Sequence, residues 1–86
     1  MSEELELLKA EGRLGRKAVA TFLHDLADKI AKGKVLLQKG DQQVPLDLPD
    51  SVTLEIEVEE EIREGRTVRS LEVEIEWHEG DESPSA

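Results

Sequence analysis

His24 is the residue best suited to acid–base or metal chemistry, and Asp28 follows it one helical turn later. A histidine and a carboxylate at this spacing can share a metal ion, or the carboxylate can orient the imidazole as a base. The sequence offers no nucleophile, oxyanion donor or third ligand to complete such a set. His78 follows the last apolar segment and is expected to be exposed. We therefore expect a non-enzymatic protein without a cofactor or a metal centre.

Glutamates recur at every second position in two segments near the C-terminus, and they are the most unusual feature of the sequence. They are Glu55, Glu57 and Glu59, followed by Glu72, Glu74 and Glu76. Clustered carboxylates suit hard cations such as Ca²⁺ or Mg²⁺, but side chains on a flat sheet do not converge as those of a calcium loop do. Three interpretations stay open: a solvated face, a docking surface for a basic partner, and a specific cation site.

Apolar residues alternate with these glutamates, which predicts two half-buried strands. A two-residue turn at Glu64-Gly65 would bring the apolar positions of the two strands opposite each other. The expected pairs are Val58 with Leu71, Ile56 with Val73, Leu54 with Ile75 and Val52 with Trp77. A shift of one residue would expose all of them, so the sequence specifies this register firmly.

The same register predicts a crowded outer face. Glu57 would lie opposite Glu72 and Glu55 opposite Glu74, and like charges in these positions are destabilising. We expect relief only near the turn, where Glu60 meets Arg69 on this face. Crowding should favour protonation and raise the pKa values of these carboxyl groups.

A helix is predicted over residues 16–32, between Gly15 and Gly33. Its apolar residues are spaced by three and four positions and form one stripe, which we expect to face the sheet. They are Val19, Phe22, Leu23, Leu26, Ala27 and Ile30. Residues 3–11 fit strand and helix patterns about equally, and we expect a short strand there.

A first hairpin is predicted over residues 34–48. A turn at Gly40-Asp41 would pair Leu37 with Val44 and Val35 with Leu46. Pro45 and Leu36 would share the outer face and, with Leu48, enlarge an apolar patch near a sheet edge.

These elements predict an α+β fold in which one helix packs on one face of a four-stranded antiparallel meander. The N-terminal segment would add a short fifth strand beside the last strand. We expect a single domain over residues 1–78 and a disordered acidic tail over residues 79–86.

Aromatic residues are only 2% of the chain, so Trp77 is one of its few large side chains. It either fills the core at the end of the sheet or anchors an interface with a partner.

Composition restricts the classes of partner. The chain of 86 residues carries 21 acidic and 11 basic residues, for a formal charge of −10, which disfavours nucleic acid. It contains no cysteine, which fits a reducing compartment. No segment resembles a signal peptide or is apolar enough to span a membrane. We expect a soluble, cytoplasmic protein that has no membrane or nucleic-acid partner.

Several of these segments together resemble the amphi-Trp domain. They are residues 14–28 with Phe22-Leu23 and Leu26-Ala27-Asp28, residues 33–37, residues 44–49, and the amphipathic strand from Leu71 to Trp77. The resemblance covers roughly residues 3–78, and Trp77 matches the tryptophan that ends the family's amphipathic strand. It implies the architecture of a small archaeal and bacterial domain without an assigned activity.

The leading hypothesis for function is an interaction or scaffold module. It would present its acidic sheet face, with Trp77 at the end of the last strand, to a protein partner or to a second copy of itself. The alternative is a divalent-cation-binding protein that uses the glutamates of the outer face. An enzyme based on His24 and Asp28 ranks last.

Overall fold

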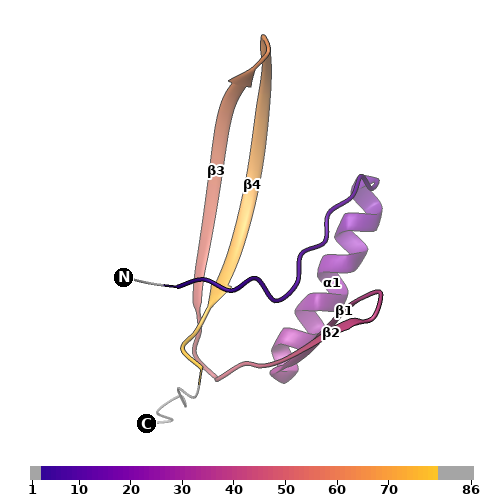
Figure 1. Ribbon diagram of the computed structural model, residues 1–86, viewed down its shortest axis with the longest axis vertical. Helices are drawn as coiled ribbons and strands as arrows, with labels where there is room; N and C mark the ends of the chain where they lie inside the picture. The colour runs from indigo at the N-terminus through magenta and orange to yellow at the C-terminus, as the bar shows by residue number, and fades with distance from the viewer. Residues whose placement is uncertain (1–2, 80–86) are drawn as a thin grey trace. The chain divides into compact units, whose positions relative to one another are not determined.

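The computed structural model describes residues 3–79, which contain one helix followed by four strands (Figure 1). The elements are α1 (Arg16–Lys32), β1 (Lys34–Lys39), β2 (Gln42–Asp47), β3 (Thr53–Arg63) and β4 (Arg66–Glu76). The strands form two antiparallel hairpins, β1–β2 and β3–β4, each of which is a two-stranded sheet. The predicted α+β class and the antiparallel pairing of neighbouring strands are therefore confirmed, whereas a single four-stranded meander is not.

The chain divides into two compact units, Met1–Leu48 and Pro49–Ala86. The first contains α1 and the β1–β2 hairpin, and the second contains the β3–β4 hairpin. A single domain over residues 1–78 stays a prediction. The expected acidic tail lies outside the described residues, except for Glu79, which is exposed.

Helix α1 begins and ends at the predicted positions. Gly15 precedes it with extended backbone angles, φ −68° and ψ 154°, and its carbonyl accepts a hydrogen bond of 3.1 Å from the Val19 amide. Gly33 ends the helix at φ 80°, a left-handed conformation that glycine adopts without a Cβ clash. Its amide donates to the Ile30 carbonyl at 2.9 Å, which satisfies one of the last helical carbonyls.

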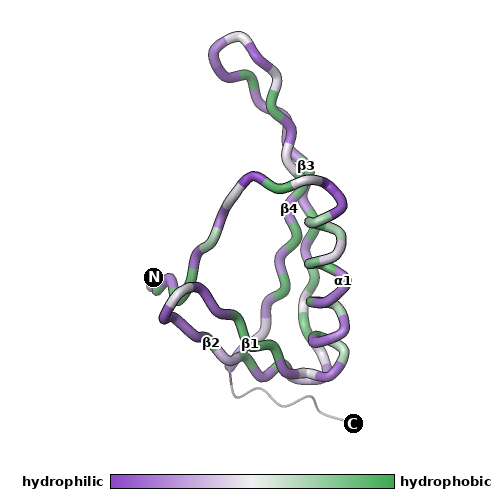
Figure 2. The backbone as a smooth tube through the Cα atoms, turned by 90° about the vertical axis from the view of Figure 1, so that its right-hand side faces the viewer, coloured by the Kyte–Doolittle hydropathy of each residue, from purple (hydrophilic) through white to green (hydrophobic). Residues whose placement is uncertain are grey.

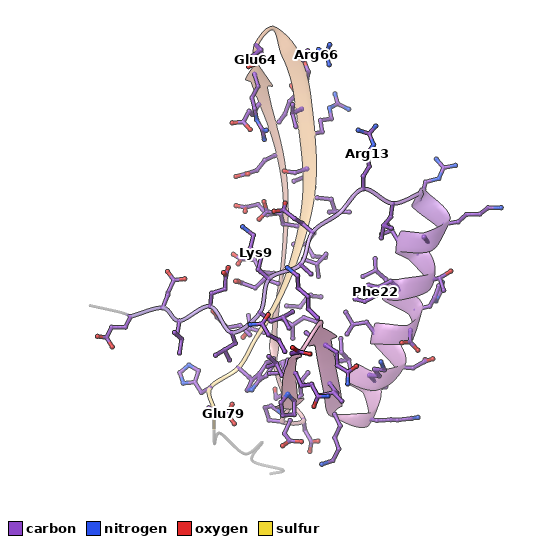
Figure 3. All side chains as sticks on the ribbon, turned by 45° about the vertical axis from the view of Figure 1, so that its right-hand side comes forward. Lys9, Arg13, Phe22, Glu64, Arg66 and Glu79 are labelled. Atoms are coloured by element: carbon purple, nitrogen blue, oxygen red, sulfur yellow. The ribbon has the colours of Figure 1, made fainter. Side chains whose placement is uncertain are left out.

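Within unit 1, the apolar stripe of α1 is covered at one end only. Leu26 and Ile30 are half-buried, and α1 contacts β1, whose Val35 is 4% exposed. Val19 and Phe22 are exposed, and Phe22 is labelled where it projects from the helix in Figure 3. The prediction that the whole stripe packs on a sheet is not confirmed.

The β1–β2 hairpin has the predicted register, with Leu37 opposite Val44 and Val35 opposite Leu46. Gly40 adopts φ 60° in the turn, where a residue with a Cβ would be strained. The hairpin is joined back to the helix end by a 2.9 Å hydrogen bond from the Leu48 amide to the Gly33 carbonyl. Unit 1 is thus organised around this contact and the buried side chain of Val35.

Residues 3–15 form no helix or strand, so the predicted fifth strand is not confirmed. The alternation that suggested it covers only Leu5 and Leu7, both of which are exposed. Leu8 breaks the alternation, so no continuous apolar face remains for a strand to bury. The segment does contact the first hairpin, because Lys39 Nζ donates a 2.7 Å hydrogen bond to the Lys9 carbonyl.

The β3–β4 hairpin confirms the predicted register of the long strands over its whole ladder. Glu64 and Gly65 form the turn with φ 50° and 78°, the two positive values that a type I′ turn requires. Hydrophobic and hydrophilic residues alternate along both strands in Figure 2. The ladder ends at Thr53 opposite Glu76, so the predicted pair of Val52 with Trp77 lies just beyond it.

Candidate functional site

One face of the β3–β4 hairpin collects the glutamates that the sequence singles out. Successive side chains of a strand point to opposite faces, so odd-numbered residues of β3 and even-numbered residues of β4 share this side. We call it the acidic face, and its glutamates are Glu55, Glu57, Glu59, Glu61, Glu72, Glu74 and Glu76. All of them are exposed. Glu61 is absent from the predicted set, although the same alternation, continued for one more step, would have included it.

Like charges face each other at the centre of the acidic face. Glu57 lies opposite Glu72 and Glu55 lies opposite Glu74, as the register predicts. The hairpin therefore holds glutamates next to one another both along and across the strands. The folded hairpin retains this repulsion, and a positively charged ligand bound to this face would reduce it.

The sequence-based expectation for Glu60 and Arg69 is wrong in one respect. They do lie opposite each other, and Arg69 Nε donates to Glu60 Oε1 at 2.8 Å. Because Glu60 is an even-numbered residue of β3, however, the pair lies on the apolar face and gives the acidic face no relief. Compensation on the acidic face comes instead from Arg63, whose Nε donates to Glu61 Oε1 at 2.7 Å near the turn. Figure 3 labels Glu64 and Arg66 at that turn.

The pKa of Glu57 is raised above its ordinary value. The largest cause is the negative charge of Glu59, followed by that of Glu72 across the ladder. Neighbouring negative charges disfavour the ionised carboxylate, so proton uptake becomes easier. Glu57 thus has negatively charged neighbours both along its own strand and on the opposite strand.

The pKa of Glu74 is raised as well. A side-chain hydrogen bond with Glu55 is the largest cause, and the charges of Glu76 and Glu55 add to it. A protonated Glu74 can donate to the carboxylate opposite, which stabilises its neutral form. The predicted crowding effect is therefore found at two positions, each with its own immediate neighbours.

Within residues 3–79, one group of three carboxylates is close enough to hold a metal ion together. Oxygen atoms of Glu57, Glu59 and Glu72 lie within 4.8 Å of one another. All three side chains are exposed and stand on one open face. Calcium takes six to eight oxygen ligands, so water would have to supply the remainder.

The histidines and the tryptophan are placed differently from the glutamates. His24 and Asp28 are both exposed on α1, and the described part of the chain brings no third metal-binding side chain to them. His78 is exposed, as expected. Trp77 follows directly after β4 and is half-buried, so part of its indole stays accessible at the end of the hairpin.

Together these features define a small α+β protein whose amphipathic last strand is followed by a tryptophan. The chain belongs to the Amphi-Trp domain family, whose model matches residues 1–86. The resemblance of the sequence segments to this family is thereby confirmed. No curated protein and no solved structure matches the chain significantly. Over the described residues, α1 is neither long nor apolar enough to cross a membrane.

Proposed function

We propose that this protein is a non-enzymatic interaction module whose acidic face binds a basic protein partner. The observation that carries the proposal is the row of like charges at Glu55, Glu57, Glu72 and Glu74, all exposed on one face. The negative charges of Glu59 and Glu72 raise the pKa of Glu57, and a hydrogen bond with Glu55 and the charge of Glu76 raise the pKa of Glu74. Lysine or arginine side chains would relieve that repulsion, which favours binding.

The geometry of the face favours an extended partner segment. Side chains on one face of a strand repeat at about 6.8 Å, twice the rise per residue. An extended peptide with basic residues at every second position has the same repeat, so several ion pairs can form at once. Trp77 lies one residue beyond β4, where strand alternation would put its side chain with the apolar residues, so it would contact a partner only at the end of the hairpin. We also propose that the protein is cytoplasmic, because a chain without cysteine fits a reducing compartment.

Affinity capture from the protein's own cell lysate at moderate salt tests this proposal. The wild type is compared with the double variant Glu57→Gln/Glu72→Gln, which removes charge from the centre of the acidic face. The matched control is Glu3→Gln/Glu4→Gln, which changes the net charge equally in a segment without helix or strand. We expect basic proteins to be captured by the wild type and the control and lost with the central variant. Equal capture by all three would refute a role for the acidic face.

A second candidate function is divalent-cation binding at Glu57, Glu59 and Glu72, which the 4.8 Å spacing of their oxygens favours. Titration calorimetry with Ca²⁺, Mg²⁺ and Mn²⁺ separates it from protein binding. Saturable binding tighter than roughly 1 mM would exceed what a diffuse acidic surface gives and would favour this candidate. Weak, non-saturating heats would exclude it.

A further inference from the structure

The opposite side of the β3–β4 hairpin is apolar, and no described residue of unit 2 covers it. Its cross-strand pairs are Leu54 with Ile75, Ile56 with Val73, and Val58 with Leu71. All of these side chains except Ile75 are exposed, with Ile56 at 60% and Val58 at 72%. A two-stranded hairpin is only marginally stable in water unless its apolar face is covered. We call this side the apolar face, and it is separate from the surface used in the proposed function.

An ion pair lies on the same side, one step nearer the turn. Glu60 and Arg69 are 2.8 Å apart and both largely exposed, and Ile62 lies opposite Thr67 beyond them. Read toward the turn, the apolar face carries three apolar pairs and then one acid–base pair. A well-fitting occupant must supply apolar groups over the first part and opposite charges over the second.

We infer that the apolar face packs against the same face of a second copy, about a two-fold axis that runs along the hairpin. Such an axis places β3 of one copy over β4 of the other at equal distances from the turn. Val58 then meets Leu71 of the second copy, and Glu60 meets Arg69 of the second copy. Each pairing within one hairpin is repeated between copies, so apolar groups and charges are both complementary.

The position of the ion pair selects this orientation. A two-fold axis across the strands would set β3 over β3 in opposite directions. Glu60 and Arg69 would then pack against an aliphatic pair of the second copy. If the copies shifted along the hairpin to avoid this contact, Leu54 and Ile56 would be left uncovered. Burying charges against aliphatic side chains is costly. The axis along the hairpin avoids this and keeps both acidic faces in water.

Other occupants fit less well. A membrane surface carries negative charge, and so does this protein, with a formal charge of −10, so the two would repel each other.

The size of the apolar face limits the strength of the dimer. Strands of 11 residues give a face about 37 Å long and about 10 Å wide. This is on the order of half of the ~800 Å² that each partner contributes to a standard interface, so the dimer is expected to be weak and concentration-dependent.

Charge reversal tests the inference on the full chain. The single variants Glu60→Arg and Arg69→Glu place like charges opposite each other between copies and should weaken dimerisation by more than about tenfold. An equimolar mixture of the two should recover dimers that contain one chain of each. The double variant Glu60→Arg/Arg69→Glu keeps the pair within each hairpin and should dimerise like the wild type. Sedimentation velocity over a concentration series measures the wild type, the three variants and the mixture.

Two further measurements keep the test decisive. Circular dichroism shows whether each single variant is folded. If one is not, a mixture of the wild type with the double variant carries the test, because like charges would face each other in a mixed dimer and such dimers should not form. Glu4→Gln, in the segment before α1, serves as the control and should leave dimerisation intact. A wild type that is monomeric at every concentration would overturn the inference. So would single variants that dimerise as well as the wild type, or a mixture that shows no recovery.

Discussion

Glu57 lies directly opposite Glu72 in the β3–β4 ladder, and both carboxylates stand exposed on the same face. A pair of this kind is destabilising in a sheet. The hairpin holds it because the opposite face needs the same register to align Ile56 with Val73. Packing and charge thus favour different registers, and packing decides, since a shift of one residue would separate every apolar pair.

Added salt should stabilise the protein near neutral pH. Screening weakens repulsion between exposed carboxylates more than it weakens apolar contacts. We expect the midpoint of thermal unfolding to rise between about 10 mM and 500 mM NaCl, where the Debye length falls from about 30 Å to a few ångströms. The variant Glu57→Gln/Glu72→Gln should show a smaller rise, whereas Glu3→Gln/Glu4→Gln should behave like the wild type. A midpoint independent of salt would rule out repulsion as a significant factor.

Mild acidification should stabilise the protein through Glu57 and Glu74. The pKa values of both groups are raised in the folded hairpin, so the folded state binds more protons than the unfolded chain in the range just above the ordinary value of 4.5. Their contribution is complete below that value and is lost as pH rises through the raised values. Thermal unfolding in low salt at pH 5 and pH 7 measures the difference. Glu57→Gln/Glu74→Gln should reduce it, and an unchanged difference would contradict the assignment to these two groups.

The start of α1 can be strengthened by one substitution. Gly15 occupies the N-cap position with extended backbone angles and no side chain to accept a hydrogen bond. An added Cβ meets no atom within 4 Å, so Gly15→Asp should stabilise the protein by a few tenths of a kcal/mol. Gly12→Asp is the control, because it adds the same charge in open space outside the helix. Chemical denaturation compares the two, and equal effects would argue against capping.

Val35 should be the most sensitive aliphatic position in unit 1. It is 4% exposed, and no other described residue is buried to this degree. Val35→Ala removes two methyl groups and should lower the free energy of unfolding by roughly 1–3 kcal/mol. Leu36→Ala, at the next position but 45% exposed, should cost distinctly less. A similar loss for both variants would mean that the contact between α1 and β1 does not depend on this side chain.

Local features of the sequence were sufficient to predict the helix, the two hairpins and both registers. Gly15 and Gly33 mark the helix ends, and the turns at Gly40-Asp41 and Glu64-Gly65 determine which residues pair. The acidic face follows from alternation alone, because side chains of one strand change sides at every residue. The same rule, applied consistently, also places Glu60 on the apolar side.

Features that depend on distant contacts were predicted less well. The segment around Leu8 has no consistent alternation, so pairing partners elsewhere in the chain would decide its structure. The stripe around Phe22 is recognisable from its spacing, but spacing does not specify which surface covers it. A local pattern likewise does not identify a binding partner, although it does show the negative charge that the proposed partner would meet.

The most direct test of the acidic face is an NMR titration of the full chain with a synthetic peptide that has lysine at every second position. We expect amide shifts confined to residues 55–61 and 72–77, which weaken with added salt and are reduced in Glu57→Gln/Glu72→Gln. Shifts of equal size at Glu3, Glu4 and Glu6, or none on the hairpin, would contradict the proposal that this face is the binding surface.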